Sequence, residues 1–219
     1  MFVGHFAVAF AARRVEPRLS LPVLLAAVAF LDILWPLFIL LGIEHARIVP
    51  GITAASPLDL YDFPYSHSLL ASLGWSALFA LPWLARRQWR PALIAGACVF
   101  SHFVLDFVSH RPDLPLAPGG AARVGLGLWN ALWPAVIVEG LLFAGALGFY
   151  LRGSHARGRM GTIGLALFVL VNAGAWLSGV FGPPPPSIIV VAVSALVFMP
   201  ILLGWSYAID RARPLTRPV

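Results

Sequence analysis

The sequence predicts an all-α protein, a polytopic transmembrane helical bundle of about six spanning helices with a short half-inserted helix at its N-terminus. Composition is the first observation behind this prediction. Hydrophobic residues make up 60% of the 219 positions and charged residues only 11%, and the mean hydropathy of +0.87 is more than a soluble core requires. The second observation is a series of apolar stretches of about 20 residues, the length that crosses a bilayer. We expect a single integral membrane domain over residues 1–219.

The apolar stretches predict the helices in order. The first segment, which ends at Glu16 and Pro17, is too short to span the membrane. Spanning helices are expected over residues 19–42, 66–85, 91–110, 128–151, 160–181 and 187–209. Ser66 is placed to cap the second of these helices, and the GPPPP run is expected to form a turn between the last two.

Arginines in the connecting segments predict the orientation. They gather at four positions that alternate along the chain: Arg13, Arg14 and Arg18; Arg86, Arg87 and Arg90; Arg152, Arg157 and Arg159; Arg211, Arg213 and Arg217. Because short cytoplasmic segments of membrane proteins are rich in positive charge, the net charge of +6 indicates topology and not nucleic-acid binding. We expect a multi-pass protein of the inner cell membrane, with membrane lipids as partners, no nucleic-acid partner and a cytoplasmic C-terminus.

One apolar stretch, SHFVLDFVSHRPD at residues 101–113, carries ionisable residues in helical register. His102 and Asp106 are four residues apart, so they share a helix face at a separation of about 6 Å and can reach one ion. His110 is four residues further on, about 12 Å along the axis from His102 and about 80° round the helix. We therefore expect His110 to be a proton donor, a substrate contact or a ligand of a second ion.

Ionisable residues in the other segments lie at a matching depth. Counting about 1.5 Å of rise per residue from the nearest arginine cluster places them in the middle or outer half of a hydrocarbon core about 30 Å thick. A charge at the bilayer centre costs about 2.5 to 3.5 kcal/mol on insertion scales. A divalent cation, with Zn²⁺ the first choice, would offset these costs. The predicted metal ligands are His5, Asp32, His67, His102 and Asp106.

Other roles are open for several of these residues. A His and an Asp in this spacing often serve helix packing, His67 could be an interfacial histidine, and His5 could be a capping or interfacial one. Glu139 could be a catalytic general base, a group that orients a ligand histidine, or a packing carboxyl.

Two arginines on the outer side are candidate substrate-binding residues. Arg111 and Arg123 lie where the positive-inside pattern disfavours arginine. They could hold the phosphate or carboxylate head group of a substrate, or form a salt bridge to Asp113 or Asp59.

Residues 1–140 resemble a known family. The resemblance is carried by His5 on a short apolar segment, Asp32 at the end of the first long segment, His-Ser-Leu-Leu from His67, and the Ser-His-Phe-Val-Leu-Asp run that contains His102 and Asp106. It is to the bacterial membrane-bound metal-dependent hydrolases, the group that includes the LexA-binding inner-membrane hydrolases. The resemblance implies a cell-membrane protein with a divalent metal site formed by these five residues.

Two classes of function fit this pattern. In a metal-dependent hydrolase, the cation activates water against a phosphoester, ester or amide of a lipid-like or envelope substrate, His110 or Glu139 transfers the proton, and Arg111 steadies an anionic head group. In a permease, the same residues carry protons, metal ions or small solutes. A scaffold with a structural metal is a third possibility. The site would lie within residues 1–151, with the helices over 160–209 as accessories.

The arginine pattern gives a testable topology. A reporter fused to the C-terminus is expected in the cytoplasm, and one inserted near Gly119 outside the cell. Green fluorescent protein and alkaline phosphatase fusions report the two sides, since the first fluoresces in the cytoplasm and the second is active outside. The reverse pattern would turn the candidate site toward the cytoplasm.

Overall fold

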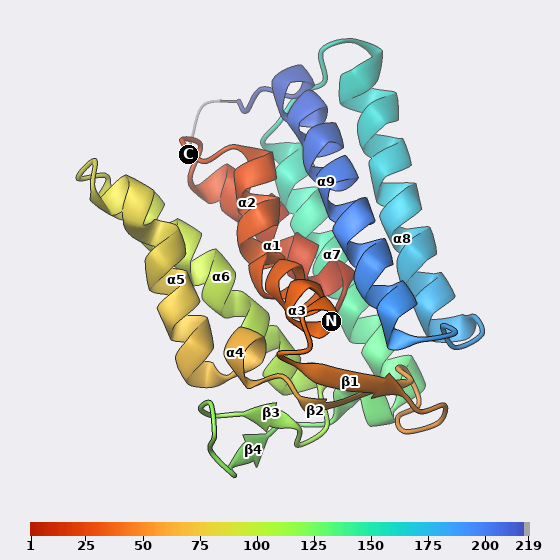
Figure 1. Ribbon diagram of the computed structural model, residues 1–219. Helices are drawn as coiled ribbons and strands as arrows, with labels where there is room; N and C mark the ends of the chain where they lie inside the picture. The colour runs from red at the N-terminus through yellow and green to blue at the C-terminus, as the bar shows by residue number, and fades with distance from the viewer. Residues whose placement is uncertain (217–219) are drawn as a thin grey trace.

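The computed structural model describes residues 1–216, so Arg217 of the last arginine cluster lies outside the described residues. Helices form a bundle with two short β-hairpins at one end (Figure 1). Helix α1 (Val3–Val15) lies in the middle and packs against α2, α6 and α7. The C-terminal end of the last helix, α9 (Ile188–Ala212), lies at the opposite end of the bundle from the hairpins (Figure 1).

The N-terminal segments form α1, α2 (Leu21–Val28) and α3 (Phe30–Leu40). Helix α1 ends where predicted, because the ring of Pro17 disfavours helical backbone at Glu16. The single helix expected over residues 19–42 is instead two helices bent by 53° at Ala29.

The second expected span is also broken. Its first turn is α4 (Pro64–His67), and α5 (Leu69–Leu84) follows after Ser68. The prediction that Ser66 caps this helix is wrong, since the Ser68 side chain accepts the backbone N–H of Ala71 and the Ser66 hydroxyl turns to Glu44. Helix α6 (Trp89–Ser109) then runs unbroken to His110 and ends before Pro112, which disfavours helical backbone at the residue before it.

The C-terminal half is made of long helices. A 3₁₀ turn, η1 (Leu128–Asn130), precedes α7 (Leu132–Arg152). A π-helical turn, η2 (Met160–Gly164), leads into α8 (Leu165–Phe181), and α9 (Ile188–Ala212) completes the bundle. The run of prolines connects α8 to α9 as predicted, because proline lacks the N–H that would continue a helix.

The connections at the hairpin end contain short strands that the all-α prediction did not include. Strand β1 (His45–Ile48) pairs with β2 (Leu58–Asp62), and β3 (Leu114–Pro115) pairs with β4 (Arg123–Val124), both antiparallel. Both hairpins lie together beyond the ends of α3 and α6 (Figure 1).

The number of candidate membrane spans is smaller than the six expected. Within residues 1–216, four helices are long and apolar enough to cross a membrane, namely α6, α7, η2 with α8, and α9. A fifth span is formed if the bent pair α2 and α3 counts as one, while α5 is shorter, with 16 residues. A membrane-spanning helical bundle is therefore supported. The turns that carry the second and third arginine clusters lie at the end opposite the hairpins (Figure 1).

The apolar core lies between α1 and the surrounding helices. Phe10 of α1 is fully buried and contacts Phe143, Tyr150 and Phe168 of α7 and α8, with ring centroids 5.3 to 6.3 Å apart. This packing fixes α1 inside the bundle, although it is too short to cross a membrane.

The loop after the second hairpin docks onto the C-terminal end of α6, and this contact is testable. The backbone N–H groups of Leu126 and Gly127 donate to the carbonyls of Phe107 and His110, at 2.7 and 2.6 Å. Gly125 has φ of +155°, and a Cβ there would lie 2.5 Å from the His110 carbonyl oxygen. Gly125→Ala should therefore destabilise the protein by about 1 to 3 kcal/mol and lower its thermal unfolding temperature in detergent.

Gly74→Ala in α5 is the matched control, because no atom outside its own helix backbone lies within 4 Å of the added Cβ. It should leave the unfolding temperature unchanged or slightly higher. Equal unfolding temperatures for the two variants would show that the loop contact does not stabilise the fold.

Candidate metal centre

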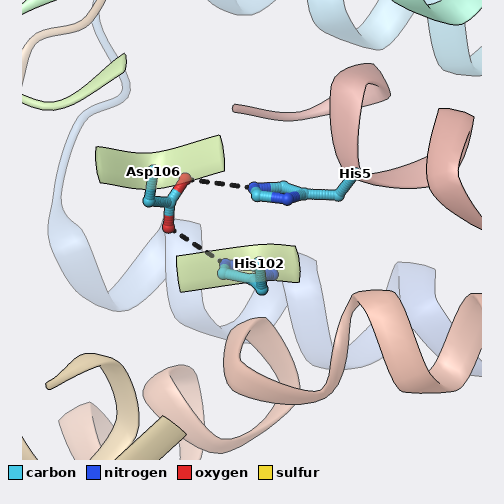
Figure 2. Close-up of side chains that lie close together, drawn as sticks. All are labelled: His5, His102 and Asp106. Atoms are coloured by element: carbon cyan, nitrogen blue, oxygen red, sulfur yellow. Dashed lines mark hydrogen bonds and ion pairs between the residues drawn. The ribbon is translucent and has the colours of Figure 1, made fainter. Parts of the chain in front are cut away.

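The Asp106 carboxylate is the centre of a cluster of histidines (Figure 2). Its side chain is 3% exposed, and its two oxygens face different partners. Oδ2 lies 3.1 Å from Nε2 of His102 and 3.8 Å from Nε2 of His67. Oδ1 lies 3.1 Å from Nε2 of His5 and 3.7 Å from Nε2 of His110. Helix α6 supplies His102 and Asp106 by their four-residue spacing, as the sequence predicts, and His110 follows as the residue that caps its C-terminal end.

Asp32 faces the same cluster from the first turn of α3. Its Oδ1 atom lies 3.6 Å from Nε2 of both His67 and His102. The side chain of Asp32 is 40% exposed, whereas those of His67 and His102 are 5% and 1% exposed. The five residues predicted as metal ligands thus lie together, and Asp32 is the most exposed of them.

The side chains of His5 and His67 enter the cluster from the ends of two other helices. His5 is in the first turn of α1, and His67 is the last residue of α4. His5 also stacks on His102, with ring centroids 3.7 Å apart and an interplanar angle of 3°.

Each of three histidines is held by an acceptor outside the cluster. Nδ1 of His102 lies 2.7 Å from the carbonyl oxygen of Val28, so Nδ1 must carry the hydrogen. Val28 is the last residue of α2, and the terminal carbonyls of a helix have no partner within it. The bend at Ala29 therefore provides the acceptor that orients His102.

His67 is held through a relay. Its Nδ1 lies 2.7 Å from Oγ of Ser66, and the Ser66 hydroxyl donates to Oε2 of Glu44 at 2.5 Å. The backbone N–H groups of Tyr65 and Ser66 donate to Oε1 of Glu44, both at 2.7 Å. Because the Ser66 hydrogen goes to Glu44, His67 donates from Nδ1. Burial raises the pKa of Glu44, while the hydrogen bonds from Ser66 and Tyr65 oppose that rise.

His110 is held in the same way by Asp113. Nδ1 of His110 lies 3.0 Å from Oδ1 of Asp113, and the His110 ring lies beside Phe63 and Trp129, with centroids 6.1 and 4.3 Å away. Arg111 in turn donates to Oδ2 of Asp113 at 3.1 Å and pairs with Asp59.

These anchors leave lone pairs facing carboxylates. In the neutral form, His67, His102 and His110 present a bare Nε2 toward Asp32 or Asp106, and a bare nitrogen repels a carboxylate oxygen. Among the described residues, Nε2 of His102 is buried without a hydrogen-bond partner although Oδ2 of Asp106 is 3.1 Å away. Such an arrangement requires a proton or a cation between the atoms.

The donor atoms fit a metal ion. Four ligands around Zn²⁺ at 2.0 to 2.2 Å are separated by about 3.3 to 3.6 Å, and the nitrogen–oxygen distances in the cluster are 3.1 to 3.8 Å. Two trios have donor atoms that all lie within 4.8 Å of one another, His5 with His102 and Asp106, and Asp32 with His67 and His102. Anchoring of a ligand histidine through its second nitrogen is also the rule at protein metal sites.

Glu139 contacts the backbone at the start of α1. Its Oε1 atom accepts the backbone N–H groups of Phe2 and Gly4, at 2.5 and 3.0 Å. It thereby satisfies free N–H groups in the first turn of α1, the turn that carries His5. This contact is of the packing kind, with backbone groups as the partners, and a role as a general base stays a prediction.

The two outer arginines are both hydrogen-bonded within the protein. Arg111 bridges Asp59 and Asp113, which is the salt-bridge alternative. Arg123 is exposed and donates to the carbonyl of Gly120 at 3.2 Å. Neither contact requires a substrate, so the binding of an anionic head group stays a prediction.

Sequence reasoning missed Glu44 and the anchoring role of Asp113 on His110. Both act on histidines that the sequence did identify, Asp113 from three residues away and Glu44 across 22 residues from Ser66. The proximity of Asp113 was readable in the sequence, whereas Glu44 reaches Ser66 only through the folded hairpin.

Comparisons with protein-family models, curated proteins and solved structures find no match to this chain. The resemblance to the membrane-bound metal-dependent hydrolases therefore stays a hypothesis.

The relay to His67 can be tested at the level of metal affinity. Ser66→Ala removes the oxygen that holds Nδ1, so the affinity for Zn²⁺ should fall about 10- to 100-fold, the usual cost of losing such a partner. Equilibrium titration of the purified protein with Zn²⁺ in detergent measures it.

Ser68→Ala is the matched control two residues away. It removes the cap of α5 and should lower stability by about 1 kcal/mol while leaving Zn²⁺ affinity unchanged. An unchanged affinity in Ser66→Ala would mean that the relay does not orient a metal ligand.

Proposed function

We propose that the protein is a metal-dependent membrane hydrolase whose cation is bound by Asp32, His67, His102 and Oδ2 of Asp106. The observation that supports this most directly is the set of bare Nε2 atoms held against two carboxylates. Two carboxylates and two neutral histidines balance the charge of a divalent cation. Nitrogen and carboxylate oxygen in this number suit Zn²⁺.

The exposure of Asp32 favours catalysis over a purely structural metal. Structural zinc sites are closed, whereas catalytic sites keep one side open to water and substrate. Three of the four proposed ligand side chains are at most 5% exposed, and Asp32 is 40% exposed. Water and substrate would reach the cluster past Asp32.

The chemistry divides between the cation and the chain. A bound divalent cation supplies Lewis-acid activation of water and of the bond to be cleaved. The chain contributes fixed ligand geometry, since Val28 holds His102 and Ser66 holds His67. The helices that pack around the buried ligand side chains also exclude bulk water from them.

A lipid-like or envelope substrate is the class we favour. The cluster is carried by apolar helices, and α4 and the C-terminal end of α6, which supply His67, His102 and Asp106, lie near the hairpins (Figure 1). The opening at Asp32 is on α3, whose neighbouring side chains Ile33 and Leu34 are partly exposed and apolar. An amphiphilic substrate could approach such an opening with its apolar part in the membrane.

Asp106→Asn tests the metal site. The amide keeps the shape of the side chain but removes the negative charge and one acceptor, so bound Zn²⁺ should fall at least about tenfold. Inductively coupled plasma mass spectrometry of the desalted protein measures the metal per chain. Loss of hydrolysis of a phosphoester or ester probe should accompany the loss of metal.

His155→Ala is the control, since His155 is an exposed residue of the connection between α7 and η2 and is not among the residues of the cluster. Its metal content should equal that of the wild type. Equal metal in the wild type and in folded Asp106→Asn would mean that the register of α6 serves helix packing and not chemistry.

A further inference from the structure

The proposed cation uses only one oxygen of Asp106. Oδ1 faces away from His67 and toward His5 and His110. We propose that Asp106 bridges two divalent cations and that the second is bound by Oδ1, Nε2 of His5 and Nε2 of His110. This second subsite deepens the proposed function and rests on it.

The stacking of His5 on His102 is the first argument. A histidine binds a metal in the plane of its ring, along the nitrogen lone pair. The two rings are parallel to within 3° and 3.7 Å apart, so an ion in the plane of one lies well outside the plane of the other. His5 and His102 therefore cannot both bind a single ion along their lone pairs.

The spacing of the two rings suits a pair of ions. Paired metal ions in two-metal hydrolytic sites are about 3.5 to 4 Å apart, and the ring centroids are 3.7 Å apart. Each ring nitrogen has its own oxygen of Asp106 at 3.1 Å, Oδ1 for His5 and Oδ2 for His102. A carboxylate placed in this way can bind one ion through each oxygen.

His110 supplies the third donor of the second subsite. Its Nδ1 donates to Asp113, so its bare Nε2 faces Oδ1 of Asp106 at 3.7 Å. The side chain is 4% exposed. His110 thus has the same anchored, inward-facing arrangement as His67 and His102, which the proton-carrier interpretation does not require.

The Met1 ammonium already forms an ion pair on this side of Asp106. It donates to Oδ1 at 2.7 Å and lies 3.4 Å from Oγ of Ser109. A second cation on Oδ1 has to compete with this ammonium, and its subsite has one carboxylate where the first has two. We therefore expect the second ion to bind more weakly.

Metal stoichiometry decides between one ion and two. The full chain is stripped with a chelator in detergent, dialysed against a series of Zn²⁺ concentrations, and its metal content measured. The wild type should bind about two ions per chain, the second with the lower affinity. His5→Gln and His110→Gln should each halve the content by removing the weaker ion, and His67→Gln should remove the tighter one.

Mn²⁺ gives a second measurement that does not depend on any variant. Two Mn²⁺ ions bridged by one carboxylate are magnetically coupled, so the wild type loaded with Mn²⁺ should give a spin-coupled electron paramagnetic resonance spectrum.

For the measurement of metal content, His45→Gln is the control variant, because His45 is half exposed and pairs with Asp62 in the hairpin. It should bind as much metal as the wild type.

The outcomes separate the two proposals. One ion per wild-type chain, with uncoupled Mn²⁺ and a content unaffected by His5→Gln, would overturn the second subsite and leave the proposed function standing. No bound ion in the folded wild type would remove both. If His5→Gln fails to fold, His110→Gln and the Mn²⁺ spectrum still decide.

Discussion

Burial of the Asp106 carboxylate is the constraint on which the rest of the structure depends. A charge in an apolar bundle is tolerated when it is paired, and the unpaired cost is several kcal/mol, about the size of an entire domain's stability margin. Four histidines from three helices turn toward Asp106. The Met1 ammonium pairs with Oδ1 at 2.7 Å, while the Nε2 atoms of the histidines can meet the charge of Asp106 only with a proton or a cation between them. Burial of this carboxylate therefore accounts for the convergence of the histidines and is compatible with a metal ion.

Two breaks in the helices, at Ala29 and at Ser68, position the side chains of the cluster. The bend at Ala29 leaves the Val28 carbonyl for Nδ1 of His102 and turns α3 so that Asp32 faces Nε2 of the same ring. The break at Ser68 ends α4 at His67, so that this side chain points inward while α5 begins in a new direction. In both places a continuous helix would satisfy more of its own backbone groups. The breaks are compensated by hydrogen bonds to the side chains that build the site.

The sequence predicts those parts of the site that depend on local periodicity. The spacing of His102 and Asp106 on one helix face follows from the helical repeat alone, and burial of charge in apolar segments indicates that His5, Asp32 and His67 need partners. The breaks at Ala29 and Ser68 were not predicted, because apolar composition is the same in a bent and a straight helix. The role of Glu139 at the start of α1 and that of Glu44 behind Ser66 depend on contacts between distant segments, which periodicity does not encode.

The surroundings of the cluster bear on whether it serves catalysis or transport. A carrier must open its site alternately to both sides of the membrane. From His5 and His102, helices α1 and α6 continue toward the end opposite the hairpins through fully buried apolar residues such as Phe10, Ala95 and Val99. In α8 and α9, the buried Asn172 and Ser206 donate to carbonyls of their own helices, while Oδ1 of Asn172 has no partner among the described residues. A cluster bounded by a packed apolar core on one side, with the part-exposed Asp32 as its most exposed member, is what the proposed enzyme needs to receive substrate from one direction, and a carrier would need a second route through that core.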